Sequence, residues 1–386
     1  MNITKENINE LNAVITIKLG ADDYQSRVSN ILSEHQKRAR MNGFRPGMVP
    51  MGLIKKMYRK PVLVDEINKI LYDSLYKYIS ENKIELLGSP LPKNGEDSKI
   101  DWDNQTEFEF NYEMGLSPEF NIDTQKLASH KIPRYTIKVD DTLIDKYVDY
   151  IRKRYGKPDN PAIAQNDELK PAELNQELFD KVYGPGNVNS EDAFRNKIRE
   201  EAASMMIIES EKKYKNDIID KLIEKTKLSL PDDFLKRWLI KISEKPVTLD
   251  QVNDEYDNFA RNMKWQLIKS KIVKENSITV SKEEALSEAG KFIRFQYAHY
   301  VNKDMDEKEI EDIANKILEN EEEAKKVYER VFEDKIMNLL IKTFKIEEEE
   351  VSYDEFVKLA IPVSAKDEKS VETGFTKFFK AGFWKK

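Results

Sequence analysis

The residues best suited to chemistry in this sequence lie in the segment 42–50, which reads Asn-Gly-Phe-Arg-Pro-Gly-Met-Val-Pro. Gly43 and Gly47 tolerate positive φ, whereas the two prolines fix φ and cannot continue a helix. This pattern predicts a tight, preshaped loop that presents Phe44 and Arg45 to solvent. A guanidinium binds phosphate or carboxylate through two parallel hydrogen bonds, and an exposed phenylalanine is typical of an interface anchor. The expected chemistry is docking on an anionic partner.

The surroundings of this loop carry one sign of charge. Positions 37–60 contain no Asp or Glu but eight basic residues: Lys37, Arg38, Arg40, Arg45, Lys55, Lys56, Arg59 and Lys60. A solvated helix face is the ordinary explanation of a basic run. Here the charges flank a rigid loop in a chain whose formal net charge is −7, which argues against general binding of nucleic acid. We therefore expect a local contact with an anionic partner, and no DNA binding.

Catalytic alternatives find little support in the sequence. The histidines His35, His130 and His299 are far apart, and no Walker loop, dinucleotide-binding glycine pattern, His-Glu-x-x-His motif or nucleophile elbow is present. The run Gly-Pro-Gly at 184–186 predicts a turn, and the acidic run 347–350 is interpreted as a solvated helix end rather than a metal site. The absence of cysteine excludes thiol catalysis and thiolate metal sites. We expect no catalytic residue, no metal and no cofactor.

The length and composition of the chain limit the architectures that it can adopt. A chain of 386 residues is long enough for two or three domains. Hydrophobic residues make up 39% and charged residues 35%, which favours long amphipathic helices with much surface. The N-terminus lacks the apolar core of a signal peptide, and no run approaches the roughly 20 apolar residues of a membrane helix. These features predict a cytoplasmic protein without stable membrane insertion.

The periodicity of apolar residues predicts the elements that position the loop. Residues 1–115 are expected to form a compact α+β unit in which the loop joins two helices. Strands are predicted at 13–19, 83–87 and 106–114, and helices at 22–42, at 51–58 and after Pro61 to about position 82.

The rest of the chain is predicted to be mostly helical. Residues 116–170 are expected to be an extended connector that contains a strand at 135–139 and a helix at 142–155. Residues 171–361 are predicted as an elongated all-helical domain, with a long helix from 190 to about 227, a capping box at Ser281 and Glu284, and a last long helix at 321–344. Residues 362–386 form a tail. The predicted fold class is therefore α+β, mostly α.

Apolar side chains of the helical half are expected to be mostly core. Methionine and aromatic side chains also suit sequence-tolerant recognition of apolar segments, and the sequence alone does not separate the two sets. The candidates for an apolar cradle are Met205, Phe234, Trp238, Phe259, Met263, Phe292, Phe295 and Tyr297. In the tail, residues 375–386 alternate aromatic residues with lysine, which is typical either of disorder or of weak binding to a membrane surface or partner groove.

The run Gly-Phe-Arg-Pro-Gly-Met-Val-Pro at 43–50 resembles the signature loop of bacterial trigger factors, which reads Gly-Phe-Arg-Lys/Pro-Gly-Lys-Val-Pro. Segments 61–82, 106–123 and 170–184 are also similar to this family. The resemblance implies a chaperone that docks beside the peptide exit tunnel of the ribosome, on a ribosomal protein and ribosomal RNA, and shields apolar segments of nascent or unfolded chains without ATP. Pro46 and Met48 stand where many members have lysine. The implied contact residues are Gly43, Phe44, Arg45, Pro46, Gly47, Lys37 and Arg40.

The family usually carries a prolyl isomerase domain of about a hundred residues before its helical half. Here the chain passes from Gly156 to Lys170 through a segment, 157–169, that has no aromatic residue. Because an isomerase pocket is essentially aromatic and apolar, we expect the catalytic domain to be missing. Two alternatives stay open: a prolyl isomerase, and a chaperone that works away from the ribosome. Self-association into a homodimer also stays open.

Overall fold

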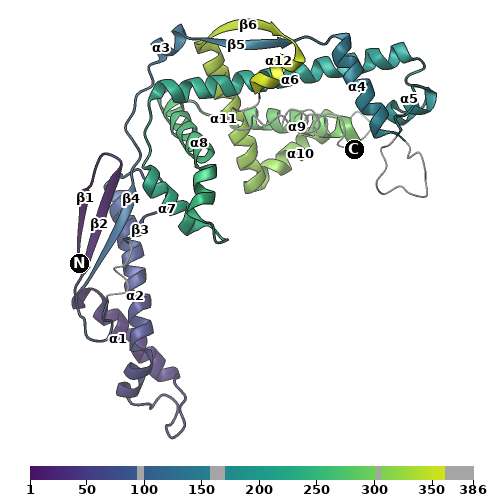
Figure 1. Cartoon of the computed structure of the whole chain (residues 1–386). Coiled ribbons are helices and arrows are strands. Elements are labelled where there is room, and N and C mark those ends of the chain that lie inside the picture. The colour runs from purple at the N-terminus through teal and green to yellow at the C-terminus, as the bar shows by residue number, and fades with distance from the viewer. Residues whose placement is uncertain (94–99, 157–169, 301–305, 361–386) are drawn as a thin grey trace. The chain divides into compact units, whose positions relative to one another are not determined.

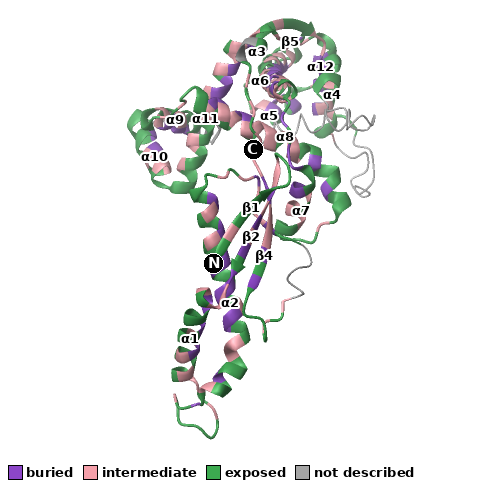
Figure 2. Ribbon diagram, turned by 90° about the vertical axis from the view of Figure 1, so that its left-hand side faces the viewer, coloured by how far each residue is buried: buried purple, intermediate pink, exposed green. Residues whose placement is uncertain are grey.

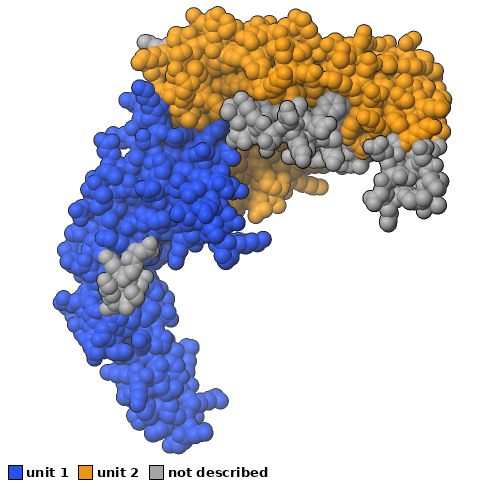
Figure 3. Space-filling view, in the orientation of Figure 1, with its two compact units in different colours: residues 1–121, 226–267 blue, residues 122–225, 268–386 orange. Residues whose placement is uncertain are grey.

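The computed structural model describes residues 1–93, 100–156, 170–300 and 306–360. The chain divides into two compact units (Figure 3), each of them discontinuous in sequence. Unit 1 contains Met1–Asn121 and Thr226–Leu267, and unit 2 contains Ile122–Lys225 and Ile268–Lys386. Within the described ranges, no helix combines the length and apolar character that crossing a bilayer requires.

Unit 1 is built on an antiparallel four-stranded sheet of order β1-β2-β4-β3 (Figure 1). Every second residue of β2 is buried, because alternate side chains of a strand face the same side of the sheet. The central pair aligns Ile17 with Phe110. The strand predicted at 83–87 is reduced to an isolated bridge between Leu86 and Leu116. The strands are β1 (Asn2–Asn7), β2 (Asn12–Leu19), β3 (Leu91–Pro92) and β4 (Phe108–Gly115).

Two long helices extend from this sheet: α1 (Ala21–Arg38) and α2 (Met51–Glu81). The sequence predicts a break at Pro61, but α2 runs through that residue as one helix. Proline removes one backbone hydrogen bond, and the buried residues on both sides of it hold the helix in place. The buried faces of both helices line the sheet and each other, whereas most residues of the intervening loop are exposed (Figure 2).

Unit 1 also contains α7 (Asp232–Ile242) and the first part of α8 (Leu249–Glu275). Helix α7 packs against β4, where a Cβ atom built on Gly115 would lie 2.6 Å from the Phe234 ring. A Cβ atom built on Gly88, whose φ is +83°, would lie 2.9 Å from the Trp238 ring. Two glycines therefore let an aromatic helix face approach the end of the sheet.

Unit 2 consists of a two-stranded parallel sheet and a set of helices (Figure 1). The pairing of β5 (Lys131–Ile137) with β6 (Lys345–Val351) joins segments that lie more than 200 residues apart. The acidic run 347–350 is therefore part of a strand, and its interpretation as a helix end is wrong. Only tertiary pairing explains a strand with four consecutive glutamates. The helices are α3 (Thr124–Ser129), α4 (Asp141–Arg154), α5 (Gln176–Tyr183), α6 (Glu191–Thr226), α9 (Lys282–Tyr300), α10 (Glu307–Glu319), α11 (Glu321–Thr343) and α12 (Tyr353–Ala360).

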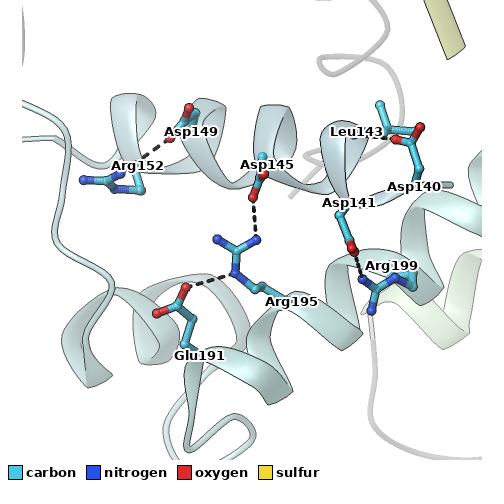
Figure 4. Close-up of polar contacts among 9 residues, drawn as sticks. All are labelled: Asp140, Asp141, Leu143, Asp145, Asp149, Arg152, Glu191, Arg195 and Arg199. Carbon is cyan, nitrogen blue, oxygen red and sulfur yellow. Dashed lines mark hydrogen bonds and ion pairs between the residues drawn. The ribbon is translucent and has the colours of Figure 1, made fainter.

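Helices α4 and α6 form the centre of unit 2. Their contact buries Tyr147, Ile151, Phe194 and Ile198, each of which is at most 1% exposed. Ion pairs lie at the rim of this contact (Figure 4). Arg195 of α6 pairs with Asp145 of α4 at 2.6 Å and with Glu191 at 2.9 Å, and Arg199 pairs with Asp141 at 2.6 Å.

A helix-capping motif that the sequence predicts is present in unit 2. The backbone amide of Ser281 donates to the Glu284 carboxylate at 2.8 Å, and the amide of Glu284 donates to Ser281 Oγ at 3.3 Å. This reciprocal pair is the predicted capping box that opens α9. The prediction of an α+β, mostly helical fold is confirmed, with β6 as an exception to an all-helical C-terminal half.

Candidate functional site

The first candidate site is the loop between α1 and α2, together with the turns that flank it. We call residues 37–60 the docking end. Its backbone is fixed by two turns, in which Phe44 N–H donates to the Met41 carbonyl at 3.1 Å and Met48 N–H donates to the Arg45 carbonyl at 2.9 Å. The amide of Gly47 reaches back to the Ala39 carbonyl at 3.3 Å, which closes the loop on its own stem.

One side chain anchors the loop to the core. Val49 is fully buried, and its carbonyl accepts a hydrogen bond from Gln36 Nε2 at 2.7 Å. Gly43 and Gly47 adopt φ of +90° and +80°, the region that favours glycine. A Cβ atom on Gly47 would lie 3.3 Å from the Lys37 carbonyl oxygen, so this glycine also permits a close approach. The prediction of a tight loop that needs glycine at positions 43 and 47 is confirmed in its geometry.

Large apolar side chains of the docking end face solvent. Phe44 is 39% exposed, Met48 70%, Met57 50% and Leu53 37%. The sequence predicts the exposure of Phe44 from the glycines and prolines around it. The exposure of Leu53 and Met57 was missed, and their spacing of four residues on one helix face is the signal that could have suggested a shared surface.

Most cations of the docking end lack an acidic partner. Of the eight basic residues, Arg59 donates to the carbonyls of Trp102 and Asp103, and Lys60 pairs with the Asp103 carboxylate at 3.6 Å. The remaining six are exposed and have no ion pair within the described part of the chain: Lys37, Arg38, Arg40, Arg45, Lys55 and Lys56. Burying these cations in a neutral interface would leave them uncompensated, so the surface suits an anionic partner.

The second candidate site is a groove of about 350 Å³ between β5 and α6 in unit 2. Its apolar lining comes from Ile137, Val139, Met206 and Ile207, and Ile207 is 65% exposed. Its polar rim includes the ion pair of Arg134 with Glu211, which holds the pKa of the Arg134 guanidinium above its ordinary value mainly through their hydrogen bond. We call this site the β5–α6 groove.

The structure separates the predicted cradle residues into three sets. Phe234 is buried, and Trp238, Phe259 and Met263 are half-buried with it in one apolar cluster of unit 1. Met205 is half-buried on α6, next to Met206 of the groove. Phe292 and Phe295 of α9 are 41% and 66% exposed, whereas the side chain of Tyr297 lies outside the described residues. Ile207 and Ile208 were not among the candidates, although both are 65% exposed.

Half-buried ionisable groups in unit 2 pair with neighbouring side chains and do not form an acid–base pair around a cavity. Burial raises the pKa of Glu201, whose carboxylate accepts a hydrogen bond from the Tyr183 hydroxyl at 3.0 Å. Burial also raises the pKa of Asp217, which pairs with Lys213. His35 stacks on Tyr58 with ring centroids 5.0 Å apart, and His130 follows the end of α3. Within the described residues no group of three or more His, Asp or Glu side chains could hold a metal ion.

Comparison with known proteins assigns the chain to a family. The family model described as bacterial trigger factor protein matches residues 1–151, and the model of the probable trigger factor C-terminal domain matches residues 210–360. The two matches together cover most of the chain. This chain belongs to the trigger factor family. The docking end lies within the first match, and β6 with most of the C-terminal helices lies within the second.

Individual relatives are distant and are matched only in part. Trigger factor of Delftia acidovorans is 31% identical over 154 residues, which is 40% of this chain and 34% of the relative. Trigger factors of Pseudomonas aeruginosa and Pseudomonas putida are 27% and 29% identical over 187 residues, with 48% of this chain and 40% of each relative covered. The matched part thus spans between a third and two fifths of these relatives.

A solved structure from work on promiscuous substrate recognition by the trigger factor chaperone is similar over 89% of this chain. It shares 14% identity with a TM-score of 0.48, and the match covers 99% of that structure.

The expected absence of an isomerase domain concerns residues 157–169, which lie outside the described residues. The chain on both sides of this segment is fixed. The amide of Ala172 donates to the Arg152 carbonyl at 2.8 Å, and a Cβ atom on Gly156 would clash with the Lys170 carbonyl oxygen. The two ends of the segment are therefore neighbours at the end of α4.

Proposed function

We propose that this protein is an ATP-independent chaperone that docks on the ribosome near the exit tunnel and shields apolar segments of nascent chains. The observation that carries the proposal is the docking end. A loop fixed by two positive-φ glycines presents Phe44 and Arg45 within a group of six exposed cations, which have no acidic partner among the residues that the structure describes. Such a surface is complementary to a partner that offers phosphates and an apolar pocket, as ribosomal RNA beside a ribosomal protein does.

Different residues of the docking end have different roles in the proposed binding to the ribosome. Gly43, Gly47 and Pro46 hold the backbone, so that little entropy is lost when the loop binds. Arg45 supplies a planar donor for phosphate, and Phe44 supplies an apolar anchor. Met48 and Pro46 carry no charge, so binding draws more on apolar contact than on the number of cations in the loop itself.

For client binding we propose the exposed apolar surface of unit 2, centred on the β5–α6 groove. Each buried Å² of apolar surface contributes roughly 25 cal/mol, so a groove of this size gives weak, sequence-tolerant binding. A client held in this way leaves by dissociation, without nucleotide. The buried Phe234 is assigned to packing and not to clients, and Phe292 and Phe295 stay candidates because they are exposed.

Ribosome docking can be tested by co-sedimentation with ribosomes. Replacing Phe44 and Arg45 by alanine removes the anchor and the guanidinium, and we expect the affinity to fall at least tenfold, which corresponds to about 1.4 kcal/mol. The matched control replaces Ile8 and Lys5, an exposed apolar and an exposed basic residue of the same unit, and should sediment like the wild type. A double variant at 44 and 45 that sediments with unchanged affinity would overturn the assignment of the docking end.

Client binding can be tested by suppression of aggregation of an unfolded protein. Replacing Ile207, which lines the β5–α6 groove, and its exposed neighbour Ile208 by serine removes apolar surface at and beside the groove, and we expect several-fold more chaperone to be needed for equal suppression. The control replaces Ile242 and Leu249, which are 49% and 53% exposed in unit 1, by serine. Equal losses in both double variants would mean that exposed apolar area, and not this groove, binds the client.

The two alternatives predict different behaviour in the same preparations. A prolyl isomerase would accelerate a proline-limited refolding reaction at catalytic concentrations. A chaperone that works away from the ribosome would suppress aggregation but would not sediment with ribosomes. We expect neither outcome, because the docking end has the local geometry of a binding loop and the chain from Gly156 to Lys170 is too short for an isomerase domain.

A further inference from the structure

The two-stranded sheet of unit 2 has one edge that no described element covers. In this parallel pair, Lys345 N–H donates to the His130 carbonyl at 3.2 Å, and Lys138 N–H donates to the Val351 carbonyl at 2.9 Å. Because alternate residues of a parallel strand bond to the same neighbour, positions 345, 347, 349 and 351 face β5. The backbone groups of Ile346, Glu348 and Glu350 therefore point away from β5, along the outer edge of β6.

The other edge of the sheet differs, because α6 lies beside it. The Ser210 hydroxyl of α6 donates to the Tyr135 carbonyl, which is one of the β5 groups that face away from β6. The side chains of β6, in contrast, are exposed or half-exposed along the whole strand. A sheet of two strands is marginal by itself, and an open edge is a template for a further strand.

The negative charge along the outer edge of β6 determines which kind of strand can bind there. Residues 347–350 are four consecutive glutamates, of which Glu347 pairs with Lys131 at 2.7 Å and Glu350 with Lys138 at 3.1 Å. Glu348 and Glu349 have no ion-pair partner within the described residues. Such a row of charges repels neutral or acidic strands, whereas a strand with lysines would form favourable cross-strand pairs.

The chain itself contains a segment of this chemistry. Residues 375–386 contain five aromatic residues, four lysines and no acidic residue. Aromatic residues favour extended strands, and lysine complements the glutamates of β6. The described chain ends at Ala360 of α12, which packs on β5 through Phe356 and Tyr135, with ring centroids 6.1 Å apart. The fourteen residues 361–374 reach roughly 45 Å when extended, more than the length of β6.

We propose that residues 375–386 bind the outer edge of β6 as an added, charge-matched strand of the same chain. The sheet of unit 2 then has three strands, and the lysines of the added strand compensate the charge of its acidic edge. The inference rests on the strand register and on charge, so it stands or falls independently of ribosome docking.

Hydrogen exchange resolved at single amides tests this arrangement in the full chain. We expect the outward amides of Ile346, Glu348 and Glu350 to be protected like the inward amides of Glu347 and Glu349. Replacing Lys377 and Lys380 by glutamate should accelerate exchange of the outward set at least tenfold and leave the inward set unchanged. The matched variant K366E/K369E changes the tail charge equally but lies outside the aromatic segment, and it should keep the protection.

A charge swap gives the decisive control. The variant E348K/E349K should lose the outward protection, and its combination with K377E/K380E should restore it. Fast exchange of the outward amides in the wild type would overturn the proposal, as would protection that is insensitive to K377E/K380E. Protection that rises with protein concentration would assign the added strand to a second copy and would also overturn binding within one chain.

Discussion

Glu201 shows at the scale of one residue how burial and a hydrogen bond act against each other. Its carboxylate lies between α5 and α6, where burial raises its pKa and the hydrogen bond from the Tyr183 hydroxyl partly offsets that rise. A carboxylate whose pKa is raised by folding stabilises the fold while protonated. This contribution is present below the ordinary glutamate pKa of about 4.3 and is lost as the pH rises through the folded-state pKa.

The substitution E201Q should therefore change the pH dependence of stability in one direction. Glutamine keeps an acceptor for the Tyr183 hydroxyl but carries no charge at any pH. We expect the variant and the wild type to be about equally stable near pH 4, and the variant to be the more stable near pH 7. Denaturation midpoints at both pH values measure the difference, with Glu200→Gln, an exposed neighbour, as the control. A difference that is the same at pH 4 and pH 7 would contradict the role of burial.

The residues of the docking end show what a sequence specifies at this scale. The exposure of Phe44 and Arg45 followed from glycines and prolines within a few positions, because turn chemistry is local. The pairing of Lys60 with Asp103 depends on a segment far away along the chain, so no local pattern indicates it. The assignment of these residues to a ribosome contact stays a prediction.

Helices α4 and α6 show at the scale of elements which interactions stabilise a contact. The ion pairs of Arg195 in Figure 4 are well formed, but the Asp145 side chain is 59% exposed and Glu191 48%. Exposed pairs of this kind contribute about 0.5 kcal/mol. Ile198, on the same helix, is fully buried against α4, where packing contributes several times more.

We therefore expect Ile198→Ala to lower the free energy of unfolding by about 3 kcal/mol and Arg195→Ala by about 0.5 kcal/mol. Chemical denaturation followed by circular dichroism measures both losses. High salt should reduce the effect of the arginine variant and leave that of the isoleucine variant unchanged. A larger loss for Arg195→Ala than for Ile198→Ala would show that the rim and not the core holds the two helices together.

The elements predicted best from the sequence are those in which apolar residues recur with a helical period over many turns. Helix α6 is an example, because each of its predicted limits differs from the observed one by one residue. The errors occur where tertiary contacts outweigh local preference. Strand β1 is polar and exposed along most of its length, and only its pairing with β2 makes it a strand. Strand β6 consists largely of glutamate, a poor strand former, and α2 continues through Pro61.

At the scale of the whole molecule, the informative feature is that unit 1 is completed by residues 226–267, far along the chain. The sequence alone predicts that residues 1–115 form a unit of their own and that the aromatic residues of α7 belong to an apolar cradle. The glycines at 88 and 115 explain the different arrangement, because they make room for Trp238 and Phe234. A glycine in a sequence gives no sign of which distant side chain will approach it.

The roles of two phenylalanines follow from this arrangement and can be separated by experiment. Phe234 is 2% exposed and fills the space above Gly115, so Phe234→Ala should lower the free energy of unfolding by about 3–4 kcal/mol. Phe295 is 66% exposed on α9, so Phe295→Ala should change stability by less than about 0.5 kcal/mol. Chemical denaturation measures both. Suppression of client aggregation, assayed at a temperature at which both variants are folded, should then fall only for Phe295→Ala. If instead Phe234→Ala left the stability unchanged and impaired client binding, α7 would belong to the cradle and unit 1 would not need it for its core.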